Sequence, residues 1–261
     1  MRNIRVVFAV LSLSVVLVAG VADELQAQEK RQGWTKRLRY RRELRRELQG
    51  EIQLSGAFAL YPMAVKWAEE FRKIHPKVRI DISAGGAGKG ITDALAKVVD
   101  LGMVSRDIYP QELEKGAFPI AVVKDAVVPT INSNNPLIDQ ILATGLKQQV
   151  AQDLWIHTTA RTWGDVLGTG STIPVHVYTR SDACGAAETF AAWLGAKQED
   201  LEGTAVFGDP GVTSVVQRDK VGIGFNNIAY AYDINSKKPY RHIAVIPLDL
   251  NGNGKIDPEE D

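Results

Sequence analysis

The sequence predicts an α/β protein with two lobes, mixed but mostly parallel sheets, and a cleft between the lobes. Strand-like and helix-like patterns alternate along residues 51–225, as expected of β-loop-α units that build parallel sheets. Short loops rich in Gly and Ala run straight into several of the helical patterns. An apolar run at residues 121–131 ends in a strong turn signal, after which the alternation begins again. This restart predicts the second lobe.

The elements of the first half follow from hydrophobic periodicity. Residues 62–75 carry apolar side chains at helical spacing, among them Trp67 and Phe71. Residues 78–83 alternate apolar and polar side chains, as in a half-buried strand. The expected strands are 51–54, 78–83 and 101–104, the last of them buried, and the expected helices are 62–75 and 91–98.

The second half begins where the chain is expected to cross between lobes. Residues 121–131 are apolar and rich in strand formers, and residues 132–136 read Asn-Ser-Asn-Asn-Pro, a turn sequence. Further strands are expected at 175–179 and 223–225, helices at 138–143, 146–153 and 188–194, and a turn opening at 163–166.

Three Gly/Ala-rich loops are the candidate binding site. They cover residues 55–62, 83–90 and 182–187, and each leads into a helical pattern. The first turn of a helix exposes unpaired backbone N–H groups and a partial positive charge, so small residues there let an anion approach the backbone. If the three loops converge, they form an anion-binding cage.

Composition excludes several classes of protein. The 261 residues are 45% hydrophobic and 24% charged, as in an ordinary globular protein. The single cysteine, Cys184, excludes an intrachain disulfide and a cysteine-rich zinc site. The four histidines show no metal-binding spacing, and the loop at 83–90 lacks both the Lys-Ser/Thr ending of a nucleotide P-loop and the dinucleotide-binding spacing. We therefore expect neither an enzyme nor a required cofactor.

The N-terminus predicts export. Arg2 and Arg5 precede an uncharged apolar run at 6–22, and Ala27 provides a small residue for cleavage before Gln28. We interpret residues 1–27 as a signal peptide of a periplasmic or secreted protein. An uncleaved membrane anchor is the alternative.

A basic arm follows at residues 28–49. Nine Lys and Arg face three Glu between residues 29 and 47, whereas residues 49–261 hold 20 basic and 26 acidic residues. The arm is either a solvated helical spacer, with Glu43 and Glu47 paired to neighbouring arginines, or a contact for acidic lipid or nucleic acid. We favour the spacer, and no nucleic-acid partner is expected.

Five motifs, in order, resemble the periplasmic solute-binding proteins of ABC transporters, and in particular their phosphate-binding branch. The resemblance covers residues 51–233 and rests on the loop and helix at 55–71, the glycine loop at 86–90, the strand and turn at 100–108, the crossover at 124–136, and the strand and loop at 177–186.

The resemblance implies a two-lobed periplasmic binding protein fold whose lobes, 50–128 and 129–232, close on a small oxyanion. A return segment at 233–261 would lead back toward the first lobe. The protein would be a monomer that presents phosphate or a related anion to the membrane subunits of the transporter. The implied ligand-binding residues are Ala57, Phe58, Ala59, Leu60, Gly86, Ala87, Gly88, Arg106, Arg180, Cys184, Gly185 and Ala186.

The departures from the family pattern concern the identity of the anion. Leu60, Ala87, Cys184 and Ala186 stand where the family has hydroxyl side chains, and none of them is a strong hydrogen-bond donor. Backbone N–H groups survive these changes, and Arg106 and Arg180 offer charge-assisted bonds. Ser83, Ser105 and Ser181 are candidate replacement hydroxyls.

Some of these residues have a second interpretation. Arg180 can pair with Asp182 instead of a ligand, and the glycines at 85–90 can serve only to permit tight turns. Cys184 lies at a helix start, where a thiol can become nucleophilic. A hydrolase that uses Cys184 is therefore a third functional hypothesis, although no histidine is near it in sequence.

The C-terminus contains a calcium-loop motif. Residues 249–260 place oxygen ligands and a glycine at the spacing of an EF-hand loop. The expected ligands of a structural Ca²⁺ are Asp249, Asn251, Asn253, Lys255 through its carbonyl, Asp257 and Glu260. The simpler interpretation is an acidic Asn/Gly-rich turn. The motif also supports a second function, a calcium-dependent structural or adhesion module without anion transport. Because the resembled family continues beyond this point, the sequence leaves open a truncated first lobe.

Overall fold

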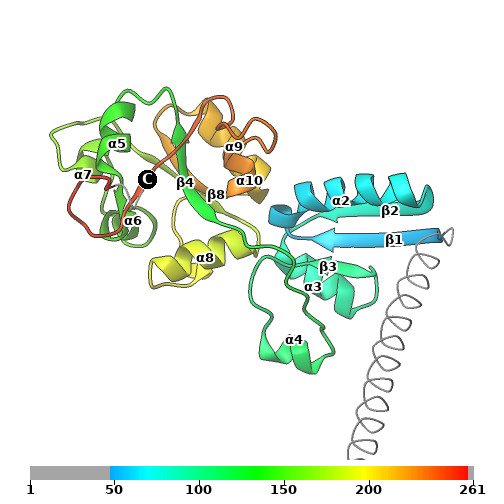
Figure 1. Ribbon diagram of the computed structural model, residues 1–261. Helices are drawn as coiled ribbons and strands as arrows, with labels where there is room; N and C mark the ends of the chain where they lie inside the picture. Colours follow the sequence, from blue (N-terminus) through cyan, green and yellow to red (C-terminus); the bar gives the residue numbers. More distant parts are fainter. Residues whose placement is uncertain (1–47, 258–261) are drawn as a thin grey trace, which may run out of the picture. The chain divides into compact units, whose positions relative to one another are not determined.

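The computed structural model describes residues 48–257, and residues 50–257 belong to one compact unit. Its main sheets have three and five strands, with helices packed against them (Figure 1). The predicted signal peptide and nearly all of the predicted basic arm lie outside the described residues. We call the three-stranded sheet and its helices the first lobe, and the five-stranded sheet and its helices the second lobe.

The first lobe confirms the elements predicted between residues 51 and 103. Strand β1 is central in the sheet, in the order β2-β1-β3, and runs parallel to β3. Helix α3 begins at Ala87 rather than at residue 91, because Gly86 (φ +91°) ends the extended chain and allows the helix to start at once. The elements are β1 (Gln49–Gly56), η1 (Phe58–Leu60), α2 (Tyr61–Ile74), β2 (Lys77–Ala84), α3 (Ala87–Leu95) and β3 (Leu101–Met103).

The second lobe contains a mixed sheet in the order β7-β6-β8-β4-β9. Strand β6 is parallel to β7 and β8, and β4 is antiparallel to β8 and β9. The strands are β4 (Val127–Asn132), β6 (His176–Arg180), β7 (Thr204–Val206), β8 (Gly222–Asn227) and β9 (Ile243–Val245). The helices that follow β4 are α5 (Ile138–Thr144), α6 (Gln148–Trp155), α7 (Trp163–Leu167), α8 (Gly185–Trp193), η2 (Gln198–Asp200), α9 (Gly208–Arg218) and α10 (Ile228–Ala231).

A cluster of buried aromatic side chains forms the main core of the second lobe. Phe190 from α8 stacks on Phe225 from β8 with ring centroids 4.4 Å apart, and Trp155 from α6 meets Phe190 edge to face. Each large apolar side chain buried in this way stabilises the fold by roughly 1.5–3 kcal/mol. This core holds α8 rigidly against the sheet, and α8 carries the third candidate loop at its N-terminus.

The structure corrects three local predictions. The strand expected at 121–131 begins only at Val127, where pairing with β8 starts, because the residues before it have no ladder partner in the described chain. Leu101, expected to be buried, is 53% exposed because β3 is an edge strand. The turn expected at 163–166 is helix α7, which Thr162 and Asp165 begin with a capping box. Short helix α4 (Pro110–Glu114) was not predicted.

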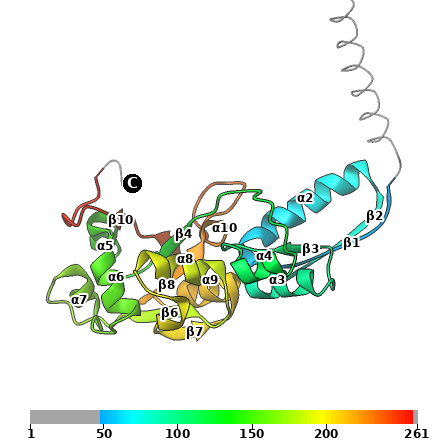
Figure 2. The same ribbon diagram turned by 90° about the horizontal axis from the view of Figure 1, so that it is seen from below.

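The C-terminal segment lies with the second lobe. Strand β9 pairs with β4, and β10 (Leu248–Asp249) pairs with β5 (Leu146–Lys147). Figures 1 and 2 both place these last residues beside α5 and α6. Residues 243–249 therefore join the larger lobe rather than returning to the three-stranded sheet, because their strand partners are there. The division of the lobes at residue 128 stays a prediction, and β4 spans it.

Candidate functional site

The first two Gly/Ala-rich loops lie against each other. The carbonyl oxygen of Gly56 accepts hydrogen bonds from the N–H groups of Gly85, at 2.8 Å, and Gly86, at 3.1 Å. A Cβ atom on Gly56 would lie 2.1 Å from the carbonyl oxygen of Met103, so only glycine fits there. The close approach of β1, β3 and the start of α3 thus depends on residue 56 being a glycine, which has no side chain.

The second and third loops also meet. A Cβ atom on Gly86 would lie 2.9 Å from the carbonyl oxygen of Ala183, and one on Gly88 would lie 3.6 Å from the Ala183 Cβ. On the other side, a Cβ on Gly185 would lie 1.7 Å from the carbonyl oxygen of Ser105. The N-termini of α3 and α8 and the turn after β3 therefore come together.

First-turn backbone N–H groups of two helices lie at this meeting point, beside the Asp182 carboxylate, whose Oδ2 would lie 3.2 Å from a Cβ on Gly86. The first-turn donors of α3, from Ala87 and Gly88, and of α8, from Gly185 and Ala186, have no acceptor within their own helices. Each helix adds a partial positive charge at the same end. The arrangement suits a small anion that can accept several N–H bonds at once.

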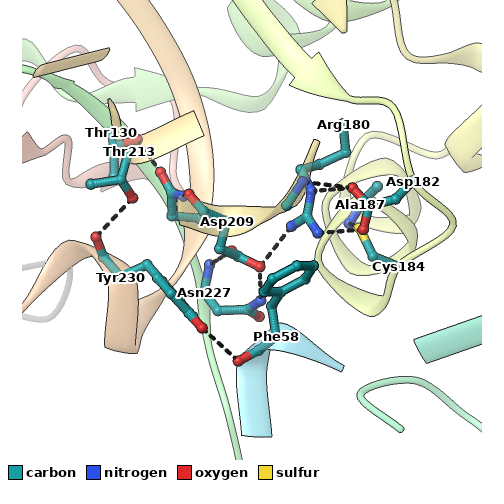
Figure 3. Close-up of polar contacts among 12 residues, drawn as sticks. Phe58, Thr130, Arg180, Asp182, Cys184, Ala187, Asp209, Thr213, Asn227 and Tyr230 are labelled. Atoms are coloured by element: carbon teal, nitrogen blue, oxygen red, sulfur yellow. Dashed lines mark hydrogen bonds and ion pairs between the residues drawn. The ribbon is translucent and has the colours of Figure 1, made fainter. Parts of the chain in front are cut away.

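The guanidinium of Arg180 is bound by two carboxylates and is not exposed to solvent. Its side chain is completely buried; Nε and Nη2 donate to Asp182 at 2.9 and 2.7 Å, and Nη1 donates to Asp209 at 2.7 Å (Figure 3). Burial alone would lower the pKa of Arg180, but the two carboxylates raise it above its usual range. The pairing of Arg180 with Asp182, which the sequence offered as an alternative to ligand binding, is thus present. A guanidinium has five N–H donors, so two remain for a ligand.

Asp209 is a residue that the sequence analysis missed. It is completely buried in the first turn of α9, and its carboxylate accepts from Arg180 and from the backbone and side-chain N–H groups of Asn227, at 2.8 and 3.0 Å. Asp182 accepts in turn from the Gly208 N–H at 2.9 Å. The acidic residue at the start of a helix in the Gly-Asp-Pro-Gly sequence at 208–211 was the available signal.

Arg106 links α4 to α8. Its Nη1 and Nη2 atoms donate to both oxygens of Glu112 at 2.9 and 2.7 Å, and its guanidinium lies 4.0 Å from the centre of the Tyr109 ring. The Tyr109 hydroxyl donates to Glu188 of α8 at 2.7 Å. The hydrogen bonds with Glu112 raise the pKa of Arg106 above its usual value. The side chain therefore connects the lobes, and its role as a direct ligand stays a prediction.

The loop at residues 57–60 contacts the second lobe through Phe58. The hydroxyl of Tyr230 donates to the Phe58 carbonyl oxygen at 2.9 Å, and the Phe58 ring centre lies 5.9 Å from the Arg180 guanidinium (Figure 3). Ala59 and Leu60 continue the same short helix, η1, and the Ala57 N–H donates to the Met103 carbonyl. All three predicted loops thus reach one region of the molecule.

Cys184 should react slowly as a nucleophile. Burial raises the pKa of its thiol to about 12, so at pH 8 it is neutral. We expect the folded protein to react at least about 100-fold more slowly with a disulfide reagent such as Ellman's reagent than the protein unfolded in guanidinium. Equal rates in the two states would contradict this and would favour the hydrolase hypothesis.

The raised thiol pKa also makes stability depend on pH. The folded state keeps this proton up to about pH 12, whereas the unfolded thiol loses it near its ordinary pKa of about 8.5. Its contribution to the free energy of unfolding is therefore fully present below pH 8.5 and declines as the pH rises toward 12.

The predicted calcium loop is closed by its own hydrogen bonds. Asp249 is buried, and its carboxylate accepts from the N–H groups of Gly252, Asn253 and Gly254 at 2.7–3.1 Å. Asp257 accepts from the Asn253 amide at 2.9 Å. Among residues 48–257, no three His, Cys, Asp or Glu side chains gather as a metal site would require. Glu260 lies outside the described residues, so calcium binding stays a prediction.

Comparison with known proteins now identifies the family. The model of the PBP superfamily domain matches residues 42–254, and the chain belongs to this superfamily. Its relatives include protein SphX of Synechococcus elongatus, 28% identical over 78% of this chain and 60% of the relative. The phosphate-binding protein PstS of Xylella fastidiosa is 28% identical over 69% of this chain and 54% of its own.

A solved structure shows the same fold. The chain matches a protein from Clostridium perfringens described as a phosphate ABC transporter substrate-binding protein with bound phosphate. The TM-score is 0.66, with 25% identity over 78% of this chain and 76% of that one. The prediction of a two-lobed binding-protein fold with mixed sheets is confirmed. The PstS and Clostridium relatives are named as binding proteins and not as enzymes.

The chain spans between half and two thirds of the length of the SphX and PstS relatives. In the described part of the chain, no helix is long and apolar enough to cross a membrane. The apolar run at 6–22, on which the signal-peptide prediction rests, lies outside that part.

Proposed function

We propose that this protein captures phosphate or a closely related oxyanion where α3, α8 and the loop at 57–60 meet, and hands it to the membrane subunits of an ABC transporter. The protein would act as an exported monomer with a cleaved signal peptide; a retained membrane anchor is the alternative. The convergence of the glycine-lined starts of α3 and α8 carries the proposal, because it brings N–H groups that have no acceptor within their own helices close together.

The charged residues around this point support binding without covalent chemistry. Arg180 is held between Asp182 and Asp209, which fix the position of its guanidinium and leave two of its five N–H donors outside these bonds. Ser105 lies directly at the start of α8, with its Oγ 2.5 Å from where a Cβ on Gly185 would be. Its hydroxyl is the replacement donor nearest to the site, in place of those missing at Cys184 and Ala186.

A structural calcium ion at residues 249–260 is a separate part of the proposal. Its support is the spacing of the side chains that carry oxygen atoms. In the described part, Asn253 donates hydrogen bonds to both Asp249 and Asp257, which lie toward opposite ends of the loop. The calcium would tie the C-terminal loop to β5 and would not contact the anion.

Calorimetric titration of the full chain with phosphate, sulfate, tungstate and arsenate, each with and without calcium, tests both parts. Tight binding of one anion supports the carrier. Thermal stabilisation by calcium alone, with no response to any anion, would favour the structural or adhesion module.

A charge placed on α3 provides a sharper test. A Cβ on Gly88 would make only ordinary contacts with Ala183, so Gly88→Asp should fold, and its carboxylate is favourable at a helix start. That carboxylate would repel an anion bound at the same N–H groups. We expect at least about a tenfold loss of phosphate affinity relative to Gly88→Asn, the neutral control of the same shape, measured by calorimetry. Equal affinities of the two variants would exclude the α3 N-terminus as the binding point.

A further inference from the structure

A pocket lined by aromatic and apolar side chains lies beside the candidate anion site. Its volume is about 660 Å³. The side chains that line it come from η1, α2, β2, α9 and α10, and include Phe58, Tyr61, Val65, Ile82, Pro210 and Tyr230.

The pocket and the anion site share parts of the same chain. Phe58 belongs to the first anion-site loop and also lines the pocket. Ser83 and Ala84 line the pocket and lead directly into Gly85 and Gly86, where α3 begins. The pocket lining and the start of α3 are thus neighbours along the chain, and Phe58 belongs to both sites, so a substituent on a ligand bound at the start of α3 could reach the pocket.

The size and chemistry of the pocket do not match inorganic phosphate. An ion of five heavy atoms needs roughly the room of three waters, about 90 Å³. The pocket is several times larger and within the range of organic-ligand sites. Its lining has hydroxyls on Tyr61, Ser83 and Tyr230 but no charged side chain. Such a lining favours an apolar or aromatic group.

The anion site lacks four hydroxyl donors that the resembled family places around phosphate. Leu60, Ala87, Cys184 and Ala186 provide no hydroxyl, and Arg180 has already committed three of its N–H groups to Asp182 and Asp209. In a phosphonate, carbon replaces one of the four oxygens, and in a phosphate monoester the bridging oxygen is a weak acceptor. Either head group therefore leaves fewer acceptors unsatisfied in the closed site.

We propose that the physiological ligand is a phosphate monoester or phosphonate with a small apolar or aromatic substituent. The anionic head binds at the starts of α3 and α8, and the substituent fills the pocket between Phe58, Tyr61 and Tyr230. This inference rests on the proposed function, because it uses the same anion site.

Calorimetry on the full chain with phenyl phosphate, methylphosphonate, inorganic phosphate and benzyl alcohol tests it. We expect phenyl phosphate to bind at least tenfold more tightly than inorganic phosphate, to compete with it, and benzyl alcohol not to bind measurably. If inorganic phosphate binds as tightly as phenyl phosphate, this inference is wrong and the proposed function stands. If no phosphorus compound binds the folded chain, this inference is wrong, and the proposed function stands only if sulfate, tungstate or arsenate binds.

Variants of Val65 locate the substituent. Val65 lines the pocket from α2 and lies outside the anion-binding loops. Val65→Phe should place an aromatic ring where the phenyl group would lie and reduce the preference for phenyl phosphate over inorganic phosphate to less than threefold. Val65→Ala, the control at the same position, should keep the tenfold preference. A preference that Val65→Phe leaves unchanged would show that the phenyl group lies elsewhere.

Discussion

Replacing Asp209 by alanine is expected to lower the free energy of unfolding by about 3–5 kcal/mol. Asp209 is completely buried and accepts hydrogen bonds from Arg180 and Asn227. Without it, Arg180 keeps only Asp182 as a partner, and the Asn227 backbone and side-chain donors lose their acceptor in the interior. Urea unfolding followed by circular dichroism measures the change, and the melting temperature should fall by about 10 °C.

Asp209→Asn separates the effect of the charge from that of the side-chain size, and Asp139→Ala is a surface control. Asp209→Asn keeps the size of the side chain and one carbonyl acceptor, so its cost should be smaller than that of Asp209→Ala. Asp139→Ala removes an exposed carboxylate from α5 and should change stability by less than about 0.5 kcal/mol. If Asp209→Ala were as stable as Asp139→Ala, the buried network would have no structural importance.

Substituting alanine for Gly185 is expected to abolish most of the anion affinity. The new Cβ would lie 1.7 Å from the carbonyl oxygen of Ser105, a distance at which the backbone must move. The start of α8 would then shift away from the start of α3. The loss of two N–H bonds at about 1–3 kcal/mol each weakens binding by about 30-fold or more. Calorimetric titration with phosphate, or with phenyl phosphate, gives the measurement.

Gly170→Ala is the matched control for this substitution. A Cβ on Gly170 meets no atom within 4 Å, so affinity and stability should both stay near those of the unchanged protein. Full anion affinity in folded Gly185→Ala would show that the contact between α8 and the turn after β3 does not shape the site.

Most of the fold could be predicted because it follows from local patterns. The periodicity of α2 and the alternation of β2 each identify an element within a few residues. Residues 121–126 have strand-like composition as well, but they remain outside the sheet because strand formation needs a partner ladder. Helix α9 was missed because its glycines and proline at 208–211 look like a loop, whereas the structure uses them to start a helix.

The site could be predicted only in part. Gly86, Gly88 and Gly185 were identifiable because small residues before helices have a local physical meaning, and the structure places them together. Arg180 and Arg106 each have one partner near in sequence, Asp182 and Glu112, and one partner that is distant in sequence. Asp209 lies in α9 and Glu188 in α8, and no local pattern indicates that the fold brings them to these arginines. The ligand roles of both arginines therefore stay predictions.

The pairing of β9 with β4 has a consequence for how the chain folds during synthesis. The three-stranded sheet is complete once Met103 has left the ribosome, and its strands are close in sequence. Strand β4 pairs only with β8 and β9, so both of its edges stay open until Gly222–Asn227 is made, and one edge stays open until Ile243–Val245 is made. Such distant pairing is slow to form and leaves an unpaired edge exposed to other chains. We therefore expect the nascent second lobe to be the part most dependent on chaperones.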